Sequence, residues 1–536
     1  MVESFSIRAN TTHVRRLRCF LMLLFQHPST NPCLTFLVPP LCLTHRRSKA
    51  YMNDMLTVDF ATAKDWLYTG VGIMPNDKDM RDYLAANDWT YPIVARAGAD
   101  SASMAAEVEE VHVIRDMVLA FEDPIKCVEA MASPDVKIVS LTITEFGYRV
   151  PLTKGDFKLI ERALNGELGS DKPLDEDSMT PTTFGVICAS AGARFQRKLR
   201  PFTLMSCDNL PHNGDVCKRR MTNAAEELVC AGLCSASLND FVAWLQTEMR
   251  YPSTMVDRIT PATSWEDIAT LPQKFGFEDK WPVMCEPYKH WVIEDNFVDD
   301  ARPAWESVGA VLVPDVIPHE LMKVRLLNVT HSAMCYVGLL AGCTHVHEAV
   351  THSKIRTFLE YIMAEEIGAT LRANPEMGGN EVLLHNIPKY SNEILTRFEN
   401  VAVKDTLDRI AMDGSEKFRV QGKSVVTEGI ALGLPMNAFA LYVAAWAYFV
   451  QSEVIAGNQV KDMGAAMVTA PFQEGGSGLP AFLGMEEIFG ELTKDEAWKE
   501  RVTTAHRNIV EFGIGHTIDD LIGVEVEVDA PATPAR

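Results

Sequence analysis

Short apolar runs alternate with helical patterns between residues 66 and 206. The run Val136–Ile143 is almost wholly apolar and rich in β-branched residues, which is typical of a strand buried on both faces. On either side of it, Pro124–Met131 and Thr182–Leu199 carry apolar residues at the spacing of amphipathic helices. A further strand is expected over Pro201–Ser206. This alternation predicts a parallel sheet covered by helices, a doubly wound α/β domain.

The predicted strands are followed by polar residues. Glu145 comes after the strand Val136–Ile143, and Asn209 comes after the strand that ends at Ser206. Ligands of open α/β sheets bind beyond the carboxyl ends of the strands, so we expect both side chains at a site. Asp77 follows a strand that begins near Trp66 and is a candidate for binding the adenosine ribose of a dinucleotide. Asp77 could instead be the N-cap of the next helix.

The second half of the chain has a different pattern. Strand signals fade near residue 312, and long helical patterns follow, for example over 354–371 and 495–512. The run 438–450 is apolar almost all round but falls short of the roughly 20 residues that span a membrane, so we interpret it as a core helix. The expected domains are an atypical segment 1–43, a dinucleotide-binding domain 44–312 and a helical domain 313–536.

One predicted helix of the second domain carries four polar side chains. Residues 320–331 contain no Gly or Pro, and their leucines recur at helical spacing. At about 100° per residue, Glu320, Lys323, Asn328 and His331 fall within an arc of roughly 140°. Lys, Asn and His are usually exposed unless they are paired, so a partly buried polar face indicates a site. The alternative is a solvated amphipathic helix.

The spacing Lys323-x4-Asn328-x2-His331 resembles the catalytic signature of the long-chain, zinc-independent mannitol dehydrogenase family, which includes polyol dehydrogenases and hexuronate reductases. Other blocks resemble the same family in the same order, among them 141–148, 206–214, 255–261, 281–287 and 405–417. The resemblance implies an α/β, Rossmann-like NAD-binding domain followed by a mostly helical, all-α domain. It also implies a monomeric enzyme that interconverts a polyol and its ketose with NAD and without a metal.

Such an enzyme needs a base for the hydroxyl proton and groups that stabilise the developing alkoxide. We expect Lys323 to be the base, with its pKa lowered by burial beside a positive nicotinamide. Asn209 and Asn328 would donate hydrogen bonds to the alkoxide oxygen, and His331 would orient a substrate hydroxyl. Glu320 would relay the proton to solvent, or else form an ordinary i,i+3 ion pair with Lys323.

The resemblance implies that four further residues contact substrate hydroxyls, close the site or line it: Asp257, Arg409, Lys417 and Glu145. The expected substrate pair is D-mannitol and D-fructose. Alternatives are D-arabinitol with D-xylulose, and a hexuronate such as fructuronate or tagaturonate. A hexuronate would require an additional cation for its carboxylate.

Residues 1–43 depart from the family pattern. A basic cluster joins a short apolar run there, and prolines follow, so we interpret the segment as a leader or a wrongly predicted first exon without a folded element. His45 and Arg46 resemble the end of the family's cofactor-binding motif, but residues 41–44 hold no glycine. Glycines at such a turn let the backbone approach the pyrophosphate. A product without a working cofactor site is therefore a further alternative.

The net charge and the cysteine pattern limit the kinds of partner that the protein is expected to bind. The net charge of −22 would repel phosphates, which argues against nonspecific nucleic-acid binding. The twelve cysteines are scattered without a C-x-x-C pair, so we expect reduced thiols, a cytoplasmic protein and no metal site. The expected partner is a small polyol or ketose, with no nucleic acid and no membrane.

Overall fold

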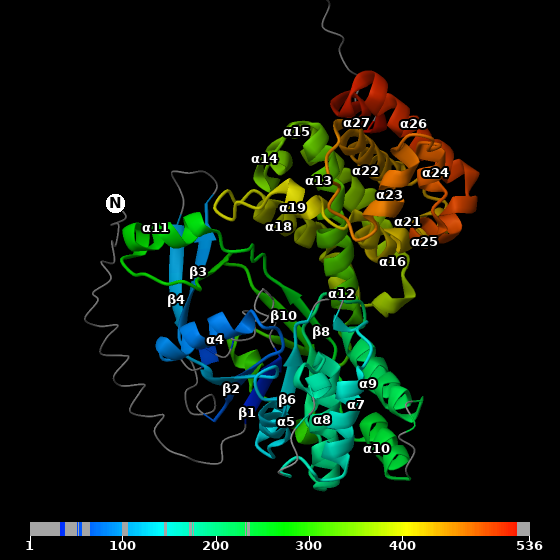
Figure 1. The fold of residues 1–536 in the computed structure, drawn as a ribbon. Helices are drawn as coiled ribbons and strands as arrows, with labels where there is room; N and C mark the ends of the chain where they lie inside the picture. The colour runs from blue at the N-terminus through cyan, green and yellow to red at the C-terminus, as the bar shows by residue number, and fades with distance from the viewer. Residues whose placement is uncertain are drawn as a thin grey trace, which may run out of the picture.

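The computed structural model describes residues 33–37, 51, 53–55, 65–98, 105–143, 147–170, 174, 176–230, 232 and 236–522. The first part of the chain forms sheets flanked by helices, and the part after β11 (Val311–Val313) is helical (Figure 1). The expected order of an α/β region followed by an all-α region is therefore present. The predicted site residues Glu145, His45 and Arg46 and the turn 41–44 lie outside the described residues.

A five-stranded parallel sheet has the order β5-β2-β1-β6-β7. Its strands are β1 Cys33–Leu37, β2 Leu67–Gly72, β5 Ile114–Leu119, β6 Val136–Leu141 and β7 Thr203–Ser206. From β1 the chain builds outward through β2 and β5, then returns to the other side of β1 with β6. The crevice between β1 and β6 is the switch point at which ligands of doubly wound sheets bind.

Strand β1 corrects the prediction that residues 1–43 hold no folded element. Cys33–Leu37 pairs with β2 from Cys33↔Leu67 to Leu37↔Val71, and it pairs with β6 on its other edge. The segment is thus the central strand of the sheet. A short run between prolines gives little local signal, because strand formation depends on neighbours that lie far along the chain.

Both faces of this sheet are covered, and because successive strand residues point to opposite sides, neighbouring residues of one strand pack in different clusters. Val139 packs in a cluster with residues of the helices on one face, whereas its neighbour Ile138 packs with Tyr68, Trp291 and Trp305 on the other. The helices of this region are α4 Asp77–Ala86, α5 Pro124–Ala132, α7 Lys154–Leu164, α8 Thr183–Gln196, α9 Asn213–Cys230, α10 Ala236–Thr247 and α11 Trp265–Phe275.

Two three-stranded sheets extend the α/β region. One has the order β4-β3-β9, with strands Ala105–Val111, Tyr91–Ala97 and Val283–Cys285. The other has the order β11-β10-β8, and its strands β10 His290–Glu294 and β8 Thr254–Asp257 are antiparallel. Strands β8 and β9 end at or next to acidic residues, Asp257 and Glu286, at the seam with the helical region.

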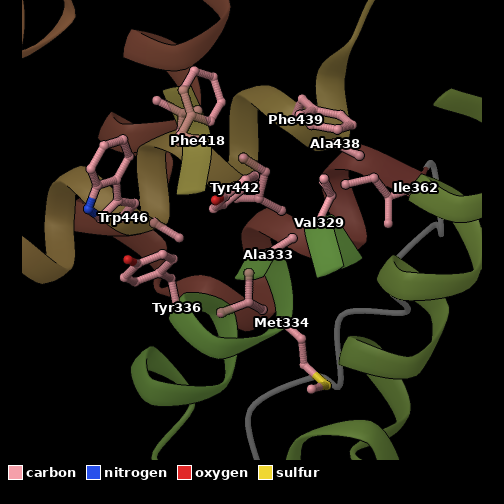
Figure 2. Close-up of a cluster of buried hydrophobic side chains, with 14 of the residues drawn as sticks. Val329, Ala333, Met334, Tyr336, Ile362, Phe418, Ala438, Phe439, Tyr442 and Trp446 are labelled. Carbon is pink, nitrogen blue, oxygen red and sulfur yellow. The ribbon is translucent and has the colours of Figure 1, made fainter. Parts of the chain in front are cut away.

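The helical region packs around α13 (Thr330–Leu340) and α22 (Asn437–Ala456). Figure 2 shows Val329, Ala333 and Tyr336 facing Phe439, Tyr442 and Trp446 within this core. The other α-helices are α12 Ile317–Lys323, α14 Val346–Thr351, α15 Ser353–Tyr361, α16 Gly368–Ala373, α17 Glu381–His385, α18 Ile387–Phe398, α19 Leu407–Ala411, α20 Gly414–Lys417, α21 Lys423–Ala431, α23 Ala465–Thr469, α24 Leu479–Leu483, α25 Glu486–Phe489, α26 Glu496–Phe512 and α27 Ile514–Ile522.

Helix α22 confirms the prediction of a core helix over 438–450. Within the described part of the chain it is the one helix whose length and composition would suffice to cross a membrane, and most of that stretch is buried inside the protein. Its apolar surface is therefore used in packing against α13, α26 and their neighbours.

The N-terminus of α22 is capped by a buried carboxylate from another segment. Glu366 lies in the π-helical turn Ile362–Ile367 and accepts hydrogen bonds from the backbone N–H groups of Ala438 and Phe439, at 2.8 and 3.0 Å. Burial of this side chain, which is 2% exposed, raises its pKa from 4.5 to about 7, and the backbone donors offset part of that rise.

We expect Glu366 to make stability fall as pH rises from about 4.5 to 7. In this window the folded protein keeps a proton on Glu366 that the unfolded chain has already released, so raising the pH favours unfolding. The contribution is on the order of 3 kcal/mol across the window. The free energy of unfolding, measured with urea at several pH values, should fall less steeply with pH for Glu366→Gln than for the wild type. Substitution of the exposed neighbour in Glu365→Gln should preserve the decline, and equal slopes for all three proteins would contradict the assignment.

Candidate active site

The carboxyl ends of β6 and β7 are joined by Asp208. Its Oδ2 accepts hydrogen bonds from the backbone N–H of Ile143, at 3.0 Å, and from the hydroxyl of Tyr148, at 2.8 Å. Tyr148 Oη also lies 2.7 Å from Ser206 Oγ. These contacts hold the two strand ends in a defined position next to the switch point, and the chain then continues directly into Asn209.

The turn after Asn209 is held by specific contacts. The side-chain amide of Asn213 donates to the carbonyls of Asp208 and Thr254 at 2.9 and 2.8 Å, which ties the turn to β8. A β-carbon on Gly214 would lie 2.3 Å from the carbonyl oxygen of Tyr251, so only glycine fits this approach. His212 has a φ of 52°, which is uncommon for a residue other than glycine. The turn therefore has a structural role in addition to the functional one that we expected.

The helix expected over residues 320–331 is not one regular helix. Helix α12 ends at Lys323, a π-helical turn spans Val324–Val329, and α13 begins at Thr330. The wider π-turn changes the direction of later side chains, so the predicted arc of roughly 140°, which assumed 100° per residue throughout, does not apply. Interruptions of this kind frequently occur at functional sites. Sequence periodicity could not detect it, because the apolar residues remain buried through the turn.

Lys323 contacts Asn209 from the other region of the protein. Its Nζ donates to Asn209 Oδ1 at 2.7 Å, and its side chain is almost fully buried. The structure thus brings together two residues that are far apart in the sequence and that we predicted to act together. The contact joins the carboxyl edge of the parallel sheet to the helical region.

Glu320 lies one turn before Lys323 and is also buried. Both of its carboxylate oxygens accept from the backbone N–H of His212, at 3.2 and 3.1 Å. Burial raises the pKa of Glu320 from 4.5 to about 7, although the His212 N–H and the charge of Lys323 act in the opposite direction. A carboxyl group with this pKa can exchange a proton near neutral pH.

His331 lies at the other end of the interrupted helix, and the half-buried Asn328 lies between it and Lys323. The imidazole stacks on Phe398, with ring centroids 4.6 Å apart, and borders a pocket. Its Nε2 is buried and has no hydrogen-bond partner among the described residues. Burial lowers the pKa of His331 to about 3, so the ring is neutral at physiological pH and can exchange hydrogen bonds with a hydroxyl.

The charges of two of the predicted substrate residues, Arg409 and Lys417, act on His331 and lower its pKa. Arg409 forms a bidentate ion pair with Asp405, at 2.6 and 2.5 Å. Lys417 donates from Nζ to the carbonyl oxygen of Ile410, at 2.6 Å. Each of these two cations is thus held by a neighbour within the helical region, and their contact with a substrate stays a prediction.

The third predicted substrate residue, Asp257, has a different environment. Its carboxylate at the end of β8 accepts two hydrogen bonds from Arg397 of α18, at 2.8 and 2.7 Å, and one from Tyr390, at 3.1 Å. Arg397 also bonds twice to Glu286, at 3.0 and 2.8 Å, and lies over the ring of Tyr288. Asp257 thus takes part in a buried ion cluster between the two regions, beside the pocket that Arg397 lines.

Asp77 is the first residue of α4 and directly follows the turn after β2. Asn76, rather than Asp77, is the N-cap of α4, so the alternative interpretation of Asp77 is wrong by one residue. Asp77 Oδ2 accepts from the backbone N–H of Met74 at 2.8 Å, whereas Oδ1 is buried and unpartnered among the described residues. Burial raises its pKa to about 7. The unpartnered oxygen matches a ligand that donates a hydrogen bond, as a ribose hydroxyl does.

Sequence reasoning missed several residues of this site. Asp405 could have been found, because it precedes Arg409 by four residues, a spacing at which ion pairs form on helices, although Asp405 itself lies just before α19. No local signal could identify Arg397 or Phe398, since their partners come from distant segments. In the part of the chain that the structure describes, no group of three or more His, Cys, Asp or Glu side chains could hold a metal ion.

Known proteins match this chain over most of its length. Residues 48–307 match the model of the mannitol dehydrogenase Rossmann domain, and residues 315–510 match that of the mannitol dehydrogenase C-terminal domain. Mannitol 2-dehydrogenase from Pyrenophora tritici-repentis is 34% identical over 86% of this chain and 77% of that protein. The same enzyme from Pyricularia oryzae is 34% identical over 89% of this chain and 91% of that protein.

Solved structures also resemble this chain over most of its length. A Pseudomonas fluorescens mannitol 2-dehydrogenase in a ternary complex with NAD and D-mannitol superposes with a TM-score of 0.75 and 29% identity, over 92% of this chain and 95% of that chain. A D-sorbitol dehydrogenase in substrate-free form has a TM-score of 0.72 and 26% identity, over 91% of this chain and 94% of that chain. These likenesses confirm the predicted fold class.

Proposed function

The chain belongs to the mannitol dehydrogenase family, and on that premise we propose that it interconverts D-mannitol and D-fructose with NAD as cofactor. Family membership makes it a polyol dehydrogenase. The observation that carries the proposal is the 2.7 Å contact between Lys323 and Asn209, which joins a candidate base to the carboxyl edge of the parallel sheet. The similar Pseudomonas enzyme that binds NAD and D-mannitol supports the choice of cofactor and sugar.

The residues after β2 fit a dinucleotide. Asp77 offers a buried carboxylate oxygen without a partner among the described residues, at the edge of the sheet where the adenosine ribose lies in this type of fold. Its negative form would repel a 2′-phosphate, which favours NAD over NADP. Bound NAD supplies the acceptor for the hydride that leaves the carbinol carbon.

The protein's own residues handle the hydroxyl proton and the substrate oxygen. Lys323 accepts the proton of the reacting hydroxyl as general base. Because the carbonyl end of the Asn209 amide accepts from Lys323 Nζ, its NH2 end is directed to donate to the substrate oxygen. Asn328 donates to the same oxygen, and the neutral His331 binds a neighbouring hydroxyl through its buried Nε2. Arg409 and Lys417 close the site beside His331.

Glu320 then passes the proton from Lys323 towards solvent. We expect kcat/KM for mannitol oxidation to rise with pH through about 7, because Glu320 must be deprotonated to accept a proton, and burial places its pKa there. In Glu320→Gln this inflection should disappear and the rate should fall. The pH dependence of NADH formation measures both effects. The exposed Glu381 provides a control, and an unchanged inflection in Glu320→Gln would show that another group controls the profile.

The function itself is tested by purifying the full chain and measuring NADH formation with D-mannitol, D-arabinitol and D-sorbitol. We expect the highest kcat/KM with mannitol, and we expect reduction of D-fructose by NADH. A higher value with arabinitol would identify a different polyol as the substrate. Absence of turnover with every polyol, from protein that is folded by circular dichroism, would contradict the proposal.

We also propose that the enzyme works in the cytoplasm as a monomer. The described cysteines Cys127, Cys188, Cys207, Cys217, Cys285, Cys335 and Cys343 are all free thiols, which supports a reducing compartment. Cell fractionation and light scattering of the purified protein measure the location and the mass.

A further inference from the structure

The pocket beside His331 lies at the seam between the two regions. Ile259 lines it from the α/β side, and His331, Arg397, Phe398 and Asp405 line it from the helical side, with Val346, His347, Asn400 and Val403. The charges on its wall determine whether a neutral or an anionic sugar can bind there.

Arg409 is the first cation to consider: it does not line the pocket itself, but its partner Asp405 does, and this carboxylate occupies one edge of the guanidinium. Asp405 accepts from its Nε and Nη2 at 2.6 and 2.5 Å, the two-point geometry in which arginine binds carboxylates. The Asp405 side chain is 4% exposed, whereas that of Arg409 is 48% exposed. Asp405 therefore places its own negative charge on the pocket wall and neutralises Arg409 behind it.

Arg397 is the second cation, and it is paired even more extensively. Its Nε, Nη1 and Nη2 atoms form four hydrogen bonds with Asp257 and Glu286, whose side chains are 3% and 2% exposed. One arginine thus lies between two buried carboxylates. An incoming carboxylate would meet net negative charge here, and it would have to displace a buried partner to reach the guanidinium.

The remaining groups near His331 do not replace these cations. Lys417 does not line the pocket, and its Nζ donates to the carbonyl oxygen of Ile410 at 2.6 Å. His331 is neutral because burial lowers its pKa to about 3. Hydroxyl groups can exchange hydrogen bonds with all of these side chains, whereas a carboxylate would lose its water without gaining a free two-point partner.

We propose that Asp405 is a specificity-determining residue that occupies Arg409 and thereby makes the site select neutral polyols and ketoses over sugars that carry a carboxylate. The proposal rests on the proposed function, because it concerns the sugar that this same site binds. It assigns a specific cause to the choice between a hexitol and a hexuronate, which the catalytic residues Lys323, Asn328 and His331 do not distinguish.

The test compares D-fructose with D-fructuronate, which differs from it by a terminal carboxylate in place of a hydroxymethyl group. Calorimetric titration of the wild type, saturated with NADH, should show fructuronate binding at least about tenfold more weakly than fructose. In Asp405→Asn the ratio of the two affinities should move towards fructuronate by about ten- to a hundredfold, as expected for one new charge-assisted pair. The ratio of kcat/KM values for NADH oxidation should move in the same direction.

A matched control is Glu399→Gln. Glu399 accepts from Nη1 of Arg356 at 2.5 Å, and neither residue lines the pocket. Its replacement also removes a carboxylate from an arginine, although Arg356 keeps its second partner Glu360. This variant should keep the wild-type preference. Asp405→Ser provides a second way to release Arg409 if the asparagine variant does not fold.

Two results would overturn the proposal: wild-type protein that binds fructuronate as tightly as fructose, or folded Asp405 variants whose preference is unchanged. The wild-type measurement decides the matter even if neither variant folds. Failure of the proposed function looks different, because the wild type would then neither bind nor reduce fructose while remaining folded.

Discussion

Replacement of Lys323 with alanine is expected to lower kcat for mannitol oxidation by about 10²- to 10⁴-fold, the usual contribution of a positioned general base. The Lys323 side chain is nearly buried and its Nζ lies 2.7 Å from Asn209 Oδ1. A lysine on the protein surface therefore cannot act as the base in its place. Binding of NADH, measured by fluorescence titration, should change little, because the loss concerns proton transfer. Added methylamine should restore part of the activity in the variant.

The matched control is Lys389→Ala, since the side chain of Lys389 is 76% exposed and its ion pair with Glu393 spans 3.8 Å. This variant should retain wild-type kcat. Full NAD-dependent activity in Lys323→Ala, with folding verified by circular dichroism, would refute the assignment of the base. A loss of activity accompanied by a loss of NADH binding would assign Lys323 to cofactor binding instead.

Replacement of Arg397 with methionine is expected to lower the free energy of unfolding by about 3–5 kcal/mol, the cost of leaving buried charges without a partner. The substitution removes four hydrogen bonds and leaves Asp257 and Glu286 facing each other in a site that is almost closed to water. Because α18 and the strands β8 and β9 lie in different regions of the protein, the substitution should also loosen the seam. Urea unfolding measures the stability, and hydrogen exchange at β8 and α18 measures the loosening.

Arg356→Met is the matched control for this prediction. Arg356 also binds two carboxylates, Glu360 at 2.7 Å and Glu399 at 2.5 Å, but their side chains are 56% and 38% exposed. Exposed pairs contribute about 0–1 kcal/mol, so this variant should differ little from the wild type. Equal losses in both variants would mean that the cluster at Asp257 is not specially stabilising. Partial recovery in Arg397→Met combined with Glu286→Gln would show that the cost comes from the unpaired acids.

Local patterns predicted part of the architecture. The runs that became β6 and β7 are buried almost throughout, so their composition is uniform enough to recognise without knowledge of their partners. The run that became α22 was likewise recognisable because it is apolar all round. Strand β1 was not, because its five residues carry a weak signal and its place in the sheet depends on β2 and β6.

The candidate site was predictable only in part. Spacing and family resemblance selected Lys323, Asn328 and His331 as candidates, and the structure places Lys323 against Asn209. The π-turn between Lys323 and Thr330 could not be predicted, because a change in hydrogen-bond pattern leaves no mark on the order of apolar residues. The raised pKa of Glu320 was equally hidden, since it results from burial by segments that are distant in the sequence.

By itself, the sequence determined which side chains are available for proton transfer and which segments can form strands and core helices, because these properties follow from residue type and short-range periodicity. Only the tertiary structure decided how the charges are paired. Asp257, Glu286 and Arg397 are far apart in the chain, and each could have faced a substrate. Packing of α18 against β8 and β9 brings them together, and a buried charge is stable only when such a partner lies within hydrogen-bonding distance.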